Sequence, residues 1–339
     1  MIFNLEQLIA KFLEDFSPKQ KRVITGRFGL KDGKRATLQE IGDEFGITRE
    51  RVRQIEESAI KRLTPQVKEA AASLINGAAV YLESAGGARR DEEFMSDMEQ
   101  KFLGKGSTRY APRKLAFIFL IGGAPRYEKE NDDMHAYWYS DDKSKQKLSD
   151  FVRRVVKFFK TSDKDGILIQ KKHLKEFPDL ASQHFLTISK HFGKNVFGDF
   201  GLKAWPEIEP KTIRDKAYLV LKKHNKPLHF ENIAKFISTY GIDVKPAHIQ
   251  TVHNELIKDD RFVLVGRGIY ALREHGYEPG TVREVIVRLL KKHGPLKPQD
   301  VVKMVNEQRL LKENTILLSL QNRKDFKRLD DGKYHILEA

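Results

Sequence analysis

The chain of 339 residues contains no cysteine. This excludes disulfide bonds, thiolate zinc sites and cysteine nucleophiles, and it is typical of proteins from a reducing compartment. Long apolar runs are also missing, because the longest, Leu115 to Ile121, is far shorter than the ~20 residues of a membrane-spanning helix. The amphipathic N-terminal segment lacks a basic start and a small-residue cleavage site, which predicts a helix and not a signal peptide. We expect a cytoplasmic, nucleoid-associated protein with no membrane contact.

Sequence motifs of common enzyme classes are missing as well. There is no Walker loop, no dinucleotide fingerprint and no nucleophile elbow. A weak metal-nuclease pattern pairs Pro178-Asp179 with Glu209-Pro-Lys211, but Pro210 opposes the buried strand that this chemistry needs. We therefore predict no catalytic residue, no metal and no cofactor, and keep a protein associated with DNA modification or restriction as a minor alternative.

Acidic residues are outnumbered by basic ones. The chain has 62 Lys and Arg against 47 Asp and Glu, a formal net charge of +15, which suits a nucleic-acid partner and also plain solubility. The excess is uneven, with net charges of +2 for residues 1–85, +4 for 86–210 and +9 for 211–339. Most of the attraction for a polyanion is therefore expected from the last third.

The clearest motif is a helix-turn-helix over residues 37–63. Thr37 and Glu40 have the spacing of a capping box that begins a helix. Gly46 stands where a sharp turn needs a positive φ, and Thr48 is suited to cap the next helix.

The second helix of this motif has two faces. At 100° per residue, the positions predicted to face the core are Val52, Ile55, Ala59 and Leu63. The opposite face is polar, and its N-terminal part is predicted to read bases in a DNA major groove, because Arg suits guanine, Gln suits adenine and Glu accepts from cytosine. The predicted DNA-binding residues here are Arg49, Glu50, Arg51, Arg53, Gln54, Glu57 and Lys61. The alternative is an ordinary solvated helix face.

Three strings in this region form a family pattern. The segment from Ser17 to Leu30, which ends in Arg-Phe-Gly-Leu, is followed by Thr37-Leu-Gln-Glu-Ile-Gly and by Thr48-Arg-Glu-Arg-Val-Arg-Gln-Ile-Glu56. Together, over about residues 17–63, they resemble region four of the primary bacterial sigma factors. The resemblance implies recognition of the minus-35 promoter element and docking on the flap of the RNA polymerase β subunit.

The same resemblance implies roles for particular residues. Three positions match base contacts and two match positions near the phosphate backbone: Arg49, Glu50 and Gln54, then Arg51 and Arg53. The stretch Phe28, Gly29, Leu30 falls in the part that meets polymerase. Nothing in the chain resembles the sigma region that melts the minus-10 element, so a complete initiation factor is not expected.

The middle of the chain gives a weaker pattern. A long helix is predicted over about Thr64 to Ser84, followed by a breaker or linker at Ala85 to Ala88. Strands are predicted at Tyr137-Trp-Tyr139 and Phe197-Gly-Asp-Phe200. These signals favour two divergent winged-helix units, with one helical domain and a small sheet as the alternative.

The C-terminal third contains an internal repeat. Thr212 to His224 returns as Thr281 to His293, and each copy is predicted as helices followed by a two-stranded ribbon, the order of a winged helix. The unit 211–275 resembles the HARE-type helix-turn-helix shared by the polymerase delta subunit, some restriction enzymes and chromatin proteins, and 281–338 is a looser copy. The resemblance implies contact with DNA or polymerase.

Candidate binding residues in this repeat lie on one helix and on the wings. Ile249, Val252 and Leu256 are predicted to face the core, and the exposed residues of the recognition helix are then Gln250, Thr251 and Asn254. Arg267, between two glycines at the wing tip, is predicted to touch phosphate or enter a minor groove. The alternative is that the glycines only make the hairpin and the module binds protein. The comparable residues of the second copy are Lys327, Arg328 and Lys333.

The predicted fold is mainly α, a multidomain chain of tandem helix-turn-helix and winged-helix modules with small β wings. The predicted domains are 1–85, 86–208, 211–275 and 281–339. The predicted function is that of a non-enzymatic, DNA-binding transcription protein that recognises minus-35-like DNA, docks on RNA polymerase, or does both. A delta-like polymerase accessory protein is the alternative. The expected partners are double-stranded DNA and RNA polymerase, and the oligomeric state stays open.

Overall fold

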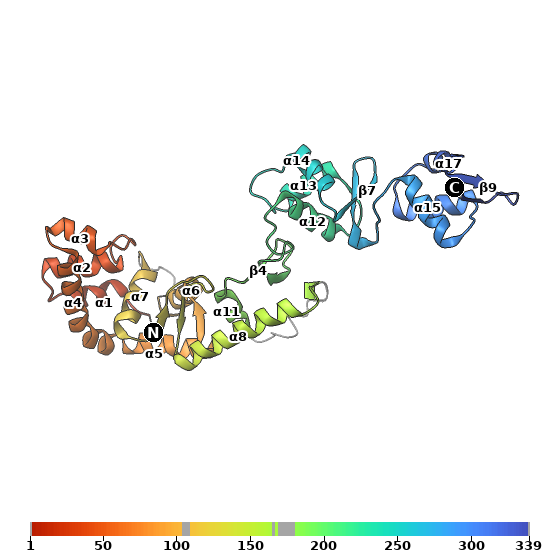
Figure 1. The fold of residues 1–339 in the computed structure, drawn as a ribbon. Coiled ribbons are helices and arrows are strands. Elements are labelled where there is room, and N and C mark those ends of the chain that lie inside the picture. The colour runs from red at the N-terminus through yellow and green to blue at the C-terminus, as the bar shows by residue number, and fades with distance from the viewer. Residues whose placement is uncertain (1, 104–108, 165–166, 169–179, 338–339) are drawn as a thin grey trace. The chain divides into compact units, whose positions relative to one another are not determined.

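The structure is a computed structural model that describes residues 2–103, 109–164, 167–168 and 180–337. It is mainly helical with antiparallel sheets of two or three strands (Figure 1), which confirms the predicted fold class. The chain divides into two compact units, one of residues 1–193 and 200–202, the other of 194–199 and 203–339. Within the described ranges, no helix has both the length and the apolar character needed to cross a membrane.

The first unit begins with consecutive helices. They are α1 (Leu5–Leu13), α2 (Pro18–Phe28), α3 (Leu38–Phe45), α4 (Arg49–Ala70) and α5 (Ala72–Ser84). The predicted single helix over about Thr64 to Ser84 is wrong at its start and in its middle, because α4 continues through Pro65 to Ala70 and α5 begins at Ala72. Leu63 and Val67 are both fully buried in one core, so the apolar face of α4 continues past the proline and holds the helix together.

The next elements are arranged as a winged helix. After α5 come β1 (Ala88–Arg90), α6 (Asp91–Phe102), α7 (Ala111–Gly122), β2 (Arg126–Glu128) and β3 (Tyr137–Tyr139), the last at the predicted position. The three strands form an antiparallel sheet in the order β1-β3-β2. We call residues 72–139 the inner winged module.

The predicted linker at Ala85 to Ala88 is a turn inside the first unit. Gly86 and Gly87 have φ of 97° and 96°, and β1 begins directly after them. One hydrophobic core extends from Leu5 to Trp138, so the elements on both sides of the turn pack together. The turn therefore reverses the chain without separating two cores.

The first unit also contains α8 (Asp142–Thr161), α11 (Leu180–Ile188), β4 (Phe192–Lys194) and β5 (Phe200–Leu202). The predicted strand Phe197 to Phe200 is wrong except at its last residue. The Asn195 side chain accepts hydrogen bonds from the backbone N–H groups of Phe197 and Asp199, both at 2.9 Å, and so makes a turn there. Part of the predicted second middle unit, 165–166 and 169–179, lies outside the described residues, and that unit stays a prediction.

The second unit contains two further winged modules, and each has its own core. The elements of the first, residues 213–272, are α12 (Ile213–His224), β6 (Leu228–His229), α13 (Phe230–Thr239), α14 (Ile249–Lys258), β7 (Phe262–Gly266) and β8 (Ile269–Leu272). A short 3-10 helix, η1 (Arg273–His275), follows. The strand order β6-β8-β7 matches the topology of the inner winged module. We call this unit the outer winged module.

The last module, residues 282–336, repeats the pattern in reduced form. Its elements are α15 (Val282–His293), α16 (Pro298–Gln308), α17 (Glu313–Leu320), β9 (Phe326–Arg328) and β10 (Tyr334–Ile336). A single bridge from Leu296 to Tyr334 stands in place of the first strand. Thr281 makes a capping box with Glu284 as Thr212 does with Asp215, so the repeat in sequence is also a repeat in structure.

Candidate nucleic-acid interface

The helix-turn-helix consists of α3 and α4, held by local signals that the sequence predicts. The Thr37 hydroxyl accepts from the Glu40 backbone N–H at 3.1 Å, and the Glu40 carboxylate accepts from that of Thr37 at 2.6 Å. Gly46 ends α3 with φ 63°, and Thr48 caps α4. A Cβ on Gly42 would lie 2.7 Å from the Ile47 carbonyl oxygen, so this tight turn requires glycine.

An ion pair that the motif analysis missed fixes the angle between α2 and α4. Arg27 Nε contacts both carboxylate oxygens of Glu56 at 3.0 and 3.1 Å, and its Nη1 donates to the Ala36 carbonyl at 2.8 Å. The pair is partly buried, which strengthens it relative to an exposed pair. Arg27 belongs to the first string and Glu56 ends the third, so these two strings meet in space.

The two faces of α4 are placed as predicted. Val52, Ala59 and Leu63 are fully buried and Ile55 is half-buried. The seven predicted DNA-binding residues are all exposed: Arg49, Glu50, Arg51, Arg53, Gln54, Glu57 and Lys61. A continuous polar surface therefore follows the first turns of the helix.

Several of these exposed side chains pair with one another. Arg53 contacts Glu50 at 2.7 Å and also Glu57. The hydrogen bond from Arg53 holds the pKa of Glu50 below its ordinary value, and the pKa of Arg53 is raised in return. Arg51 Nη1 donates to the Gln54 amide oxygen at 3.0 Å. Exposed pairs of this kind contribute little to stability, so bases and phosphates can replace them.

Arg49 differs from its neighbours. Across the part of the chain that the structure describes, no hydrogen bond or ion pair engages its guanidinium group. It stands at the N-terminus of α4, where the helix dipole adds positive charge. A free guanidinium at this end of a recognition helix is suited to the two acceptors of guanine.

Residues 12–64 match the family model of sigma-70, region 4. This segment is a sigma-70 region 4 domain. Over 59 residues, the chain is 46% identical to the RNA polymerase sigma factor SigA of Clostridium acetobutylicum, and 49% identical to the RNA polymerase sigma factor sigB of Arabidopsis thaliana. It is 46% identical to SigA of a Nostoc species over the same length.

The similarity is confined to this domain. It covers 17% of the chain and 16%, 10% and 15% of these three relatives, so the chain spans less than a fifth of each. Sigma-70 region 4 is a non-enzymatic module that binds DNA and contacts RNA polymerase, and a general role in DNA-binding transcription is supported. The resemblance of residues 17–63 to region four is thereby confirmed, while the HARE-type resemblance of the winged repeats stays a prediction.

The stretch of the region 4 domain that the resemblance assigns to polymerase is not a free surface. The Phe28 ring packs edge-on against Phe117 of α7 with centroids 5.0 Å apart. Gly29 is buried and Leu30 is only 4% exposed in the shared core. Contact of residues 28–30 with polymerase stays a prediction, and α7 of the same chain packs against this stretch.

The outer winged module presents its predicted helix residues to solvent. Gln250, Thr251 and Asn254 are exposed on α14, and the Gln250 side chain donates to Asn254 at 3.2 Å. The expected core position of Ile249 is wrong, since this side chain at the first residue of α14 is 48% exposed, while Val252 is fully buried.

The basic residues of the two predicted wings differ in their exposure to solvent. Arg267 is exposed between β7 and β8, and Gly268 has φ 69° and lies against His229, so the glycine is required by the turn. In the last module, Lys327 and Arg328 are exposed. Lys333 is half-buried and pairs with Asp331 at 2.8 Å, so it is the least available of the predicted wing cations.

The residues of the nuclease-like pattern do not assemble in the described part of the chain. Glu209 and Lys211 lie in a bend and in irregular backbone, not on a strand, and Pro178 and Asp179 fall outside the described residues. Among the residues that are described, no group of three or more His, Asp or Glu could hold a metal ion.

Proposed function

We propose that this protein is a transcription protein that reads promoter DNA, of the minus-35 type, through the N-terminal turns of α4. The exposed polar set at this end of the region 4 domain carries the proposal. Arg49 would bind guanine, Gln54 adenine and Glu50 the cytosine amino group, in keeping with their donors and acceptors. The Arg27–Glu56 pair and the Thr48 cap hold the helix ready for insertion.

We also propose RNA polymerase as a second partner, because region 4 domains contact it. Docking on the β flap through Phe28 to Leu30 would require α7 to separate from α2, since α7 covers these residues. The winged modules, within the predicted domains 86–208, 211–275 and 281–339, would add DNA or polymerase contacts. A delta-like accessory that acts by protein contact alone is the alternative that the following experiment tests.

The experiment selects duplexes from a random pool with the full chain and then measures the affinities of variants. We expect enrichment of a minus-35-like sequence. Arg49→Ala and Gln54→Ala should each lose about 1–3 kcal/mol of discrimination against the wrong base. Lys68→Ala, an exposed and distant position on the same helix, is the matched control.

The absence of any sequence preference, or equal discrimination by the two variants and the wild type, would contradict base reading by α4. A pull-down with purified RNA polymerase at low salt then separates the alternatives. Polymerase capture without sequence-selective DNA binding would support the accessory protein instead.

A further inference from the structure

Five exposed cations gather where the region 4 domain meets the inner winged module. Three come from the loop between α2 and α3, one from the turn before α7 and one from the first turn of α7. They are Lys31, Lys34, Arg35, Arg109 and Arg113. We call them the seam cluster. Arg109 and Arg113 lie outside residues 12–64, so the similarity to region 4 does not extend to them.

The two halves of the seam cluster are held together by close packing. Gly33 has φ 78°, and a Cβ on it would lie 2.7 Å from the ring of Tyr110, so the ring rests directly on the loop backbone. Arg113 Nε donates to the Gly33 carbonyl at 3.3 Å. Tyr110, the N-cap of α7, has the left-handed φ of 59° and lies under the Arg109 guanidinium. The loop and the N-terminus of α7 therefore present their charges on one surface.

Like Arg49, and unlike three other arginines of the region 4 domain, the members of the seam cluster have no carboxylate partner in the described part of the chain. Arg22 pairs with Glu44, Arg27 with Glu56, and Arg53 with Glu50. Among the residues that the structure describes, no carboxylate pairs with any member of the seam cluster. The positive end of the α7 dipole adds to the same potential.

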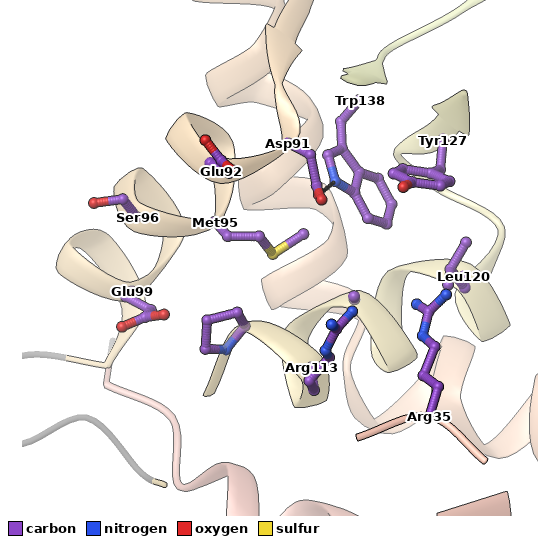
Figure 2. A pocket seen from close by; sticks show the side chains of 12 residues that line it. Arg35, Asp91, Glu92, Met95, Ser96, Glu99, Arg113, Leu120, Tyr127 and Trp138 are labelled. Atoms are coloured by element: carbon purple, nitrogen blue, oxygen red, sulfur yellow. Dashed lines mark hydrogen bonds between the residues drawn. The ribbon is translucent and has the colours of Figure 1, made fainter. Parts of the chain in front are cut away.

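Two hollows connect the cluster to α3 and to the inner winged module. One, of about 460 Å³, is lined by Lys31, Lys34 and Arg35 beside α3. The other, of about 520 Å³, is lined by Arg35 and Arg113, with acidic residues of α6 (Figure 2). Arg35 lines both, so the two hollows adjoin at its side chain.

Most acidic groups near these hollows have partners of their own, and Glu99 of α6 is the one without a partner among the described residues. Asp91 accepts from Trp138 Nε1 at 2.6 Å. Figure 2 marks this hydrogen bond with a dashed line. Glu44 is held by Arg22, and Glu40 by the cap of α3. The guanidinium groups of Arg35 and Arg113 are thus left to attract an anion from outside the protein.

We propose that the seam cluster binds the phosphate backbone of the DNA that α4 reads, on the side where α3 begins. The proposal rests on the proposed function of α4. In a helix-turn-helix the first helix crosses the DNA backbone while the second enters the major groove. Arg35 lies just before Thr37, the N-cap of that first helix. Since residues 1–85 carry a net charge of only +2, unpaired cations at this edge are the natural source of phosphate contact.

The test measures duplex affinity of the full chain from 50 to 200 mM salt. It uses the selected duplex and a scrambled duplex of equal length and composition. For the triple variant Arg35→Ala, Arg109→Ala, Arg113→Ala we expect the slope of log affinity against log salt to be shallower by about 2.7, or about 0.9 for each lost contact. The loss should be equal on both duplexes, because phosphate contacts carry no sequence information.

Two further variants make the result specific. The matched control Lys143→Ala, Lys157→Ala, Lys160→Ala removes three exposed cations of α8 and should keep the wild-type slope. Replacing the same three seam arginines with lysine keeps the charges and should restore most of the slope, which excludes misfolding of the alanine variant as the cause.

The outcomes separate this inference from the proposed function. A wild-type slope in the alanine variant, with sequence preference intact, overturns the seam assignment and leaves base reading by α4 standing. Failure of the wild-type chain to bind any duplex overturns both. Unchanged DNA binding with loss of polymerase capture assigns the cluster to an acidic protein surface and also overturns the inference.

Discussion

The helices α7 and α14 occupy the same place in two modules of the same topology, yet their surroundings are opposite. Both are the third helix of a winged order and both precede a two-stranded ribbon. In α7, Leu115, Phe117, Ile118 and Phe119 are fully buried. In α14 only Val252 and Leu256 are buried, and Gln250, Thr251 and Asn254 are exposed.

The difference follows from composition and not from topology. The sequence of α7 is apolar on nearly every side, so it packs on α4 and α1 on one side and on α6 on another. The sequence of α14 has a narrow apolar stripe that one core satisfies. The winged-helix topology therefore places a helix in the recognition position. The residues on that helix decide whether it packs inside the protein or faces a partner.

The largest expected effect comes from removing a ring at the α7 interface. Phe117→Ala deletes a fully buried side chain that contacts Phe28, and it should lower the free energy of opening of the first unit by about 3–5 kcal/mol. Gln250→Ala, at the exposed face of α14, should change the free energy of opening of the second unit by no more than about 0.5 kcal/mol.

Hydrogen exchange resolved by peptide follows each unit separately, which a single unfolding curve of two units does not. The loss of protection after Phe117→Ala should include peptides of α2 and α4 as well as α7. Protection that falls only in the inner winged module would mean that α7 is not part of the support of the region 4 domain.

Local signals are the part of this architecture that the sequence predicts well. The capping box of Thr37, the turn at Gly46 and the exposed set of α4 each depend on residues within a few positions of one another. The seven residues of α4 are exposed as expected, and their contact with DNA stays a prediction.

Long-range packing is the part that local patterns miss. Nothing near Phe28 indicates that Phe117 covers it, and nothing near Gly33 indicates Tyr110. Pro65 is a helix-breaking signal on its own, but burial of the helix on both sides of it overrides that preference. The turn at Ala85 to Ala88 is a similar case. A short glycine-rich segment can reverse the chain within one core or link two domains, and its composition is the same in both cases.

A smaller effect is expected in the stability of the outer winged module at low pH, where it should differ from the other modules. Arg261 contacts Asp259 at 2.7 Å and Asp215 at 3.1 Å. The hydrogen bond from Arg261 lowers the pKa of Asp259. For Asp215, burial raises the pKa, but hydrogen bonds from Thr212 and Arg261 outweigh it and the net direction is also downward.

Because both folded-state pKa values lie below the unfolded ones, these carboxylates stabilise the module above about pH 4. That contribution is lost as the pH falls through the folded-state values. Arg261→Ala should lower the free energy of unfolding of the outer winged module by about 1 kcal/mol at pH 7. The stability of the variant should then fall less on acidification than that of the wild type, as followed by hydrogen exchange of α12 and β7. If the pH dependence of stability is unchanged in this variant, other groups control it. Lys235→Ala, at an exposed position of α13, serves as the control.

The smallest expected effect compares the tips of two wings. The tip between β2 and β3 carries Glu130, Asp132 and Asp133, which repel phosphate, whereas the tip between β7 and β8 carries the exposed Arg267. If the outer wing touches DNA, Arg267→Ala should make the slope of log affinity against log salt shallower by about 0.9, the value for one phosphate contact.

Stability should hardly change in this variant, because the side chain is exposed and lies outside the core. Lys129→Ala, at the acidic tip of the inner wing, should leave the salt dependence unaltered. Equal slopes for Arg267→Ala and the wild type would indicate that Gly266 and Gly268 only shape the hairpin. In that case the outer wing would serve contacts with protein, and the phosphate contacts would come from the seam cluster and α4.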